Sequence, residues 1–425
     1  MRILKLFYIL LLTILFISCN NNRAVQIWTD RPEFAIYAEY FNTTQNQYKV
    51  SVRYIEFPGA ELGRTGDSPD IVIASWLKNS AMGATFRSLD NLFGAKKISR
   101  NIFYPRLLAN GRINRTQYLL PVSFNIPALV FSRDREHELS NHFTIDFEEI
   151  KRLSSSFNIQ TRGAYTRMGF SPLWSDSFLL TAAVLSGASF REPAPLHGRE
   201  AAREPLRYPL EWDSDALESS MIFINNWTNE INTSNQMEED FTFKYFVEPP
   251  ERLIRGGRIL FSYMESSDLF TLSEDRKSHL DFRWIMEQDR IPVKEDYVYL
   301  GIPKRAKSQR AARAFIQWFF RIDSQRSLLE YFRVNRLNEN IFGICGGFSS
   351  LNLVTEQIYP LFYPELLGRM PPSEHFTFPN VLPGNWITLK ERVVLPYLHE
   401  RARSESVIDV IPLERRLSDW LRLNR

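Results

Sequence analysis

The chain has 425 residues with a formal net charge of +3, and 24% of its residues are charged. A charge so close to zero gives no indication of a nucleic-acid or polyanion partner. Its two cysteines, Cys19 and Cys345, are too few for a thiolate metal cluster. The length exceeds the roughly 250–300 residues that one hydrophobic core organises, so we expect two domains.

The N-terminal segment has the pattern of a secretory signal. Arg2 and Lys5 flank the start of an apolar run over 6–17, which is short for a membrane span. A small residue and then Cys19 follow, an order that resembles the lipobox of bacterial lipoproteins. An ordinary cleaved signal with an incidental cysteine is the alternative. The lipoprotein prediction is a signal peptide over 1–18, lipid attachment at Cys19, an anchor and linker over 19–24, and location at the cell membrane facing the periplasm or cell exterior.

Strands and helices alternate in the first part of the mature chain, which predicts an α/β lobe. The expected elements are a buried strand over 25–30, a helix beginning at Pro32, an alternating strand over 48–57, a Gly-rich loop over 58–70 and an apolar strand over 71–76. The face that the helix would bury consists of Phe34, Tyr37, Ala38 and Phe41.

A second lobe is expected after two extended runs within 117–134. Its first helix would be capped by Thr144 or Asp146. Later helices would close on Gly187 and bury a stripe of Leu217, Met221, Ile224 and Trp227. The remaining expected elements are a surface loop over 191–213, strands over 258–263 and 296–303, helices over 307–332 with a turn at 322–324, a helical segment over 379–402 with Pro396 as a kink or break, and a last helix over 413–423. Ala312, Phe315, Ile316 and Phe319 would form the buried face of the helix that follows 307.

Five segments in this order resemble the extracellular solute-binding proteins of ABC importers, specifically the sugar- and maltodextrin-binding type. The segments are VQIWTD, SPDIVIAS, QYLLPVSFNIPALVFSRD, RLIRGGRILFSYMES and YLGIPKRAKSQRAARAFIQWFF. The resemblance implies an α/β, two-lobed periplasmic-binding-protein fold (type II) with a hinged cleft between the lobes. It places the crossings near 122–128, 298–303 and 340–350, with one lobe formed by 25–124 and 302–343 and the other by 126–298 and 350–425.

The function that the resemblance implies is capture of a sugar or oligosaccharide by hinge closure. The expected partners are this solute, the permease subunits of an ABC importer and the membrane that holds the lipid anchor. We expect a monomer without cofactor, metal or nucleic acid, and no catalytic activity. A lipoprotein of the same fold that acts as a solute sensor or chaperone is the first alternative.

Sugar hydroxyls need paired hydrogen bonds and the ring faces need flat aromatic partners. The resemblance places ligand contacts of the first lobe at Asp30 and Arg31, after the first strand, and at Trp76, after the third. Asn125 stands where the family has a ligand-contacting carboxylate. Asp30 could instead cap the following helix, and Trp76 could simply pack in the interior.

In the second lobe the resemblance implies contacts from Trp174, Tyr263, Glu265 and Trp386. Trp386 matches a family tryptophan that lies in the cleft. Interior packing is the alternative for Trp174, and a solvated carboxylate is the alternative for Glu265.

An enzyme is the second alternative, because two carboxylates such as Asp30 and Glu265 could perform glycoside chemistry. The chain lacks the Gly-x-Ser-x-Gly, His-Glu-x-x-His and Walker-type motifs that would specify other reactions. His137 and His142 lie in a loop-like stretch where chance proximity explains their spacing better than metal binding does.

Overall fold

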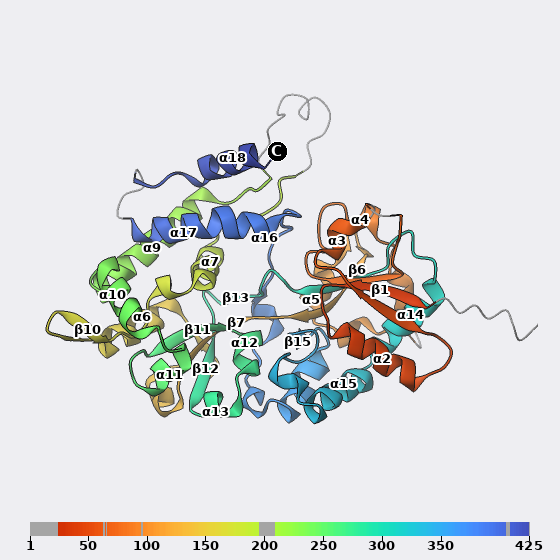
Figure 1. Ribbon diagram of the computed structural model, residues 1–425, viewed down its shortest axis with the longest axis horizontal. Coiled ribbons are helices and arrows are strands. Elements are labelled where there is room, and N and C mark those ends of the chain that lie inside the picture. Colours follow the sequence, from red (N-terminus) through yellow and green to blue (C-terminus); the bar gives the residue numbers. More distant parts are fainter. Residues whose placement is uncertain are drawn as a thin grey trace, which may run out of the picture.

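Two separate β-sheets divide the chain into two lobes, as predicted (Figure 1). The computed structural model describes residues 24–62, 64, 66–94, 97–194, 209–404 and 409–424. The predicted signal peptide 1–18, Cys19 and residues 195–208 of the predicted surface loop lie outside these residues. Within them, no helix has the length and apolar character to cross a bilayer.

The first lobe is built on a six-stranded sheet with the order β15-β6-β14-β3-β1-β2. Strands β1, β2 and β3 pair in parallel, whereas β14, β6 and β15 join by antiparallel pairing. The bounds are β1 Val25–Thr29, β2 Val50–Tyr54, β3 Ile71–Ala74, β6 Leu119–Phe124, β14 Val298–Gly301 and β15 Phe348–Ser349. Every residue of β3 and β6 is buried, as expected for strands with both faces covered.

The helices of the first lobe bury the faces that the apolar periodicity predicts. In α2, the buried residues are Phe34, Tyr37, Ala38 and Phe41, and α14 buries Ala312, Phe315, Ile316 and Phe319. The helices of this lobe are α2 Phe34–Thr44, α3 Pro58–Glu61, α4 Met82–Thr85, α5 Pro105–Asn110, α14 Gln309–Phe319 and α15 Ile322–Val334. Short 3₁₀ turns are η1 Asp90–Leu92, η2 Arg100–Ile102 and η5 Leu337–Glu339, and β4 Arg112–Ile113 pairs with β5 Thr116–Gln117.

The second lobe is built on a four-stranded sheet with the order β11-β7-β12-β8. Its central strand β7 sends alternate side chains into two different cores, Ala128 and Val130 into one, and Leu129 and Phe131 into the other. Both faces of the strand are therefore apolar. The bounds are β7 Pro127–Ser132, β8 Thr144–Ile145, β11 Phe261–Glu265 and β12 Leu280–Ile285.

Helices cover the second sheet, and two of them confirm specific sequence predictions. In α9 the stripe Leu217, Met221, Ile224 and Trp227 is buried, and α7 ends just before Gly187, whose φ is +103°. The helices are α6 Phe147–Phe157, α7 Asp176–Leu185, α9 Ser214–Ile231, α10 Asn235–Tyr245, α11 Pro250–Arg255, α12 Ser266–Thr271, α13 Glu274–Lys277, α16 Trp386–Leu389, α17 Leu395–Arg403 and α18 Leu413–Leu423. The remaining elements are η3 Arg133–Glu138, η4 Pro172–Trp174, the π-helix η10 Lys390–Val394, and the hairpin of β9 Ile159–Thr161 with β10 Ala164–Arg167.

Four local predictions need correction. The predicted loop over 58–70 begins with the short helix α3, which Pro58 can start because a first-turn residue needs no N–H partner. Asp146 caps α6, whereas Thr144 lies in β8. The predicted turn at 322–324 is already the first turn of α15. The chain stays helical through Pro396, and the π-helix η10 directly before α17 accommodates the missing N–H.

The chain crosses between the lobes at three places, of which only the first lies where it was predicted. Asn125 and Ile126 connect β6 to β7. The second crossing is at 286–297 rather than 298–303, because β14 already pairs within the first sheet. Residues 340–350 contain β15 of the first sheet, so the third crossing follows it, through the segment that ends at β16 Phe376–Thr377.

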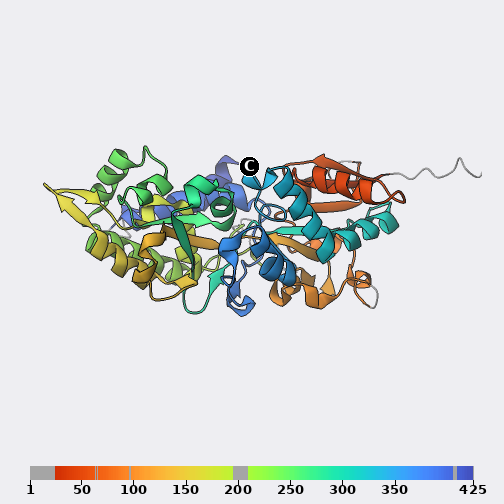
Figure 2. The same ribbon diagram turned by 90° about the horizontal axis from the view of Figure 1, so that it is seen from below.

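The segment of the third crossing packs between the lobes, as Figure 2 shows for the blue ribbon near the middle of the particle. It contains the π-helix η6 Val354–Ile358 and the 3₁₀ turns η7 Tyr359–Leu361, η8 Pro364–Leu366 and η9 Ser373–His375. Its Tyr363 ring lies 5.0 Å from Phe342 and 5.8 Å from Phe270, measured between ring centroids. Phe342 belongs to the first lobe and Phe270 to the second, so aromatic packing through Tyr363 joins the two lobes.

Two phenylalanines of α10 provide a test of the packing. Phe241 is buried against Trp174 and Tyr245, whereas Phe243 is 89% exposed. We expect Phe241→Ala to lower the free energy of unfolding by about 3–5 kcal/mol. Phe243→Ala, on the same helix, should change it by less than about 0.5 kcal/mol. Urea unfolding followed by fluorescence measures both, and equal destabilisation would contradict this packing.

Candidate ligand-binding site between the lobes

Two adjoining cavities lie beside the second crossing. The first has a volume of about 210 Å³ and the second of about 20 Å³, and they share Glu295, Pro379, Asn380 and Leu382. The other residues of the first are Leu180, Thr181, Val184, Gly187, Ser189, Phe190, Arg290, Pro292, Val293, Lys294, Thr377, Phe378 and Trp386. The second is completed by Trp76, Lys78, Tyr297, Tyr299 and Pro383. Because Trp76 and Lys78 follow β3, both lobes contribute to this site.

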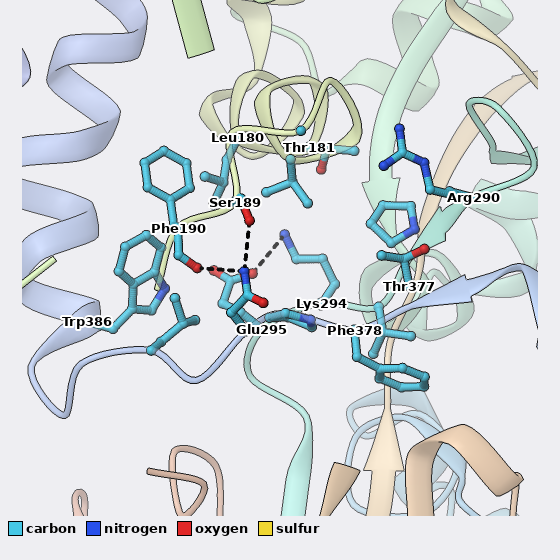
Figure 3. A pocket seen from close by; sticks show the side chains of 17 residues that line it. Leu180, Thr181, Ser189, Phe190, Arg290, Lys294, Glu295, Thr377, Phe378 and Trp386 are labelled. Atoms are coloured by element: carbon cyan, nitrogen blue, oxygen red, sulfur yellow. Dashed lines mark hydrogen bonds and ion pairs between the residues drawn. The ribbon is translucent and has the colours of Figure 1, made fainter. Parts of the chain in front are cut away.

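Aromatic rings form one wall of the first cavity (Figure 3). The Trp386 ring lies 5.7 Å from that of Phe190, and its buried indole nitrogen has no hydrogen-bond partner among the residues that the structure describes. Asn380 donates hydrogen bonds to the hydroxyl of Ser189, at 3.2 Å, and to the carbonyl of Phe190, at 3.4 Å. The structure thus places Trp386 in a cavity, with a free N–H donor.

Lys294 and Glu295, which line the cavities, belong to a network of ion pairs. The Lys294 ammonium lies 2.8 Å from Glu265 and 3.8 Å from Glu295, and Lys390 lies 2.7 Å from Glu295. Burial opposes ionisation of Glu295, but the two lysines outweigh it and lower its pKa to about 2. Burial likewise opposes the charge of Lys294, but Tyr263, Glu295 and Glu265 raise its pKa well above the usual value. The predicted site residue Glu265 is therefore a paired carboxylate.

Tyr263 joins this network from β11. Its hydroxyl lies 3.2 Å from the hydroxyl of Thr181, a residue that lines the first cavity. Burial raises the pKa of Tyr263 to about 12, so the phenol stays protonated and can donate. Tyr263 supports the cavity wall through Thr181.

Asp30 and Arg31 lie at the carboxyl end of β1, facing the second crossing. Arg31 donates to the hydroxyl of Ser75 at 2.5 Å and to the carbonyl of Asp296 at 3.4 Å. One carboxylate oxygen of Asp30 accepts the Ser75 N–H at 3.1 Å. Burial raises the pKa of Asp30 to about 6, and the Arg31 guanidinium, 3.4 Å away, only partly opposes the rise. These residues fasten the first lobe to the crossing and do not line the cavities.

Trp76 has a left-handed backbone conformation with φ of +63°. This conformation is strained for a bulky side chain and persists where the surrounding structure demands it. Here it carries the ring across to the core of the second lobe, against which Trp76 is packed. Trp76 therefore contacts both lobes at the second cavity.

Two other predicted site residues lie elsewhere. Asn125 is at the first crossing, where its side chain bonds with Ser266, at 2.6 Å, and Gly346, at 2.9 Å. Trp174 stacks on Phe241 and donates to Thr242, beside a separate cavity of about 390 Å³ under α10. The structure does not bring Trp174 together with Trp386, and ligand contact by either residue remains a prediction.

The sequence analysis missed several residues of the site. Lys294 and Glu295 belong to a charged run, Lys-Glu-Asp, directly before an extended segment, and this run was the available signal. Lys78, Arg290 and Asn380 had no comparable signal, because they lie in irregular segments. Among the described residues there is no cluster of three or more His, Cys, Asp or Glu side chains that could hold a metal ion.

The comparisons with known proteins bear on the fold. No protein-family model matches the chain, and no curated protein matches its sequence. The solved structures similar to it include the ABC substrate-binding protein Lmo0181 from Listeria monocytogenes in complex with cycloalternan, with a TM-score of 0.57 and 13% identity over 93% of this chain and 95% of that one. CpMnBP1, solved with mannotriose and with mannobiose bound, has a TM-score of 0.56 and 12% identity over 93% and 98%. At sequence identities this low, the structural similarity shows the fold alone, and it confirms the two-lobed architecture.

Glu295→Gln should make the stability of the protein less sensitive to acid. Its pKa of about 2 lies below the ordinary 4.5, so the ionised carboxylate stabilises the fold above pH 4.5. This stabilisation, on the order of 3 kcal/mol, is lost as the pH falls toward 2. Urea unfolding between pH 7 and pH 3 should therefore show a smaller loss for the variant than for wild type. Glu391→Gln, at an exposed glutamate, is the control and should lose as much stability as wild type. If Glu295→Gln also lost as much stability between pH 7 and pH 3 as wild type does, the ion pairs of Glu295 would be refuted.

Proposed function

We propose that the protein is the solute-binding component of an ABC importer and captures a sugar or oligosaccharide between its lobes. The observation that carries this proposal is the pair of adjoining cavities beside the second crossing. Aromatic rings and hydrogen-bonding side chains of the second lobe line the first cavity, and Trp76 and Lys78 of the first lobe line the second. A carbohydrate needs this combination, because its ring faces are apolar and its edges carry hydroxyls.

The free groups of the site suit a sugar. Trp386 is only 2% exposed and forms part of the apolar cavity wall. Its buried indole N–H has no hydrogen-bond partner among the described residues, so it would donate to a hydroxyl oxygen of a ligand seated against this wall. Ser189 and Asn380 add hydroxyl and amide groups at the same wall. The sugars bound by the similar solved structures, cycloalternan and manno-oligosaccharides, support a carbohydrate ligand here.

Ligand capture would work by closure about the crossings. A ligand that touches Trp386 in the second lobe and Trp76 from the first gains all its contacts only when the lobes are close together. Its binding energy would therefore shift the equilibrium toward the closed form. We propose that this form delivers the solute to membrane permease subunits, and that a lipid on Cys19 keeps the protein at the membrane surface.

Trp386→Ala should weaken oligosaccharide binding by roughly 30-fold, since removing a buried aromatic contact costs about 2 kcal/mol. Isothermal titration of residues 20–425 against a panel of malto-, manno- and galacto-oligosaccharides measures this. Trp420→Ala on α18, outside both cavities, is the matched control and should bind like wild type. If no saccharide of the panel binds the wild type, the proposal fails; if Trp386→Ala binds normally, the site is elsewhere.

A further inference from the structure

The charges that line the two cavities do not balance. Three cations, Lys78, Arg290 and Lys294, line them, against the single carboxylate of Glu295. The ion-pair partners outside the lining do not correct this, because Glu265 adds one negative charge and Lys390 one positive charge. Two positive charges remain, and they belong to Lys78 and Arg290.

Lys78 is a partly buried ammonium group with a neutral partner. It donates to the side-chain oxygen of Asn110, whose amide in turn donates to the hydroxyl of Tyr297 at 2.9 Å. Among the residues that the structure describes, no carboxylate lies within 4 Å of Lys78. Burial accordingly lowers the pKa of Lys78, to about 8, with no opposing acid.

Arg290 lies across the first cavity from Trp386 (Figure 3). Its guanidinium donates to the carbonyl of Leu185 at 2.5 Å and to the side chain of Gln288 at 3.1 Å, both neutral acceptors. A guanidinium has five N–H donors in a planar fork, so several of them remain for a ligand.

Three acids of this region bind other donors and form no ion pair with Lys78 or Arg290. Glu295 is held by Lys390 and Lys294. The carboxylate of Glu287 accepts the Phe147 N–H at 2.5 Å, and that of Glu192 accepts the Ser80 N–H at 3.3 Å. The Arg290 guanidinium opposes the rise in the pKa of Glu287 that burial causes, so Glu287 offsets part of the Arg290 charge from a distance. In the described part of the chain, however, no carboxylate forms an ion pair with Lys78 or Arg290 within 4 Å.

We propose that the solute bound at this site is an anionic saccharide, a sugar that carries carboxylate or sulfate groups. The inference rests on the proposed function and specifies its ligand. A partly buried cation without an ion-pair partner is costly, and an anionic ligand reduces that cost while it forms charge-assisted hydrogen bonds. Trp386 and Phe190 would hold a sugar ring, Arg290 an anionic group on one side, and Lys78 a second group toward Trp76.

Matched pairs of sugars test the inference with residues 20–425, which lack the predicted signal peptide and Cys19. Titration calorimetry would compare digalacturonate with neutral galactobiose, and N-acetylglucosamine 6-sulfate with N-acetylglucosamine. We expect the anionic member of at least one pair to bind at least about tenfold more tightly, and this preference to shrink at high salt. The first pair tests a carboxylate and the second a sulfate as the anionic group.

Arg290→Met and Lys78→Met should each reduce the affinity for the preferred anionic sugar about tenfold or more, and by a clearly larger factor than the affinity for its neutral counterpart. The exposed Lys49→Met, in the first lobe but outside both cavities, controls for the loss of one positive charge and should bind like wild type. Thermal unfolding of each variant confirms that it is folded.

The outcomes separate this inference from the proposed function. Equal or tighter binding of the neutral sugars overturns the anionic ligand and leaves sugar capture intact. An anionic preference that survives in both variants overturns the roles of Arg290 and Lys78. If no anionic or neutral sugar binds at all, both the inference and the proposed function fall.

Discussion

The arrangement of the two lobes depends on the hydrogen bonds around Asn125. Its side chain accepts from Ser266 of the second lobe and donates to the carbonyl of Gly346, while its own carbonyl accepts the Lys294 N–H at 2.9 Å. One residue thus ties together the first crossing, the second crossing and the loop before β15. A side chain at Gly347 would lie 2.7 Å from the Phe124 carbonyl, so this approach requires glycine. The segment fixed in this way carries Lys294 and Glu295 into the cavities.

Elements whose stability comes from local periodicity were predictable from the sequence. The buried faces of α2, α9 and α14 follow directly from apolar spacing, because a helix with one such stripe must bury it. The order of the segments also led to the two-lobed architecture. Trp386 lines a cavity beside the second crossing, and its contact with a ligand is a prediction.

Features that depend on distant parts of the chain were not predictable. The second and third crossings were misplaced because pairing of β14 and β15 with strands far away in sequence decides where each sheet ends. The surroundings of Trp174 depend on α10, which follows it by some 60 residues. Lys78 and Arg290 line the two cavities without an ion-pair partner among the described residues, and this depends on contacts between segments far apart in the sequence, so composition alone gave no sign of it.

The most direct test of the account is a crystal structure of the mature protein with a bound saccharide. The account predicts one ligand in contact with Trp386 of the second lobe and with Trp76 or Lys78 of the first. A saccharide that touches only one lobe, or that lies beside Trp174 under α10, would contradict it.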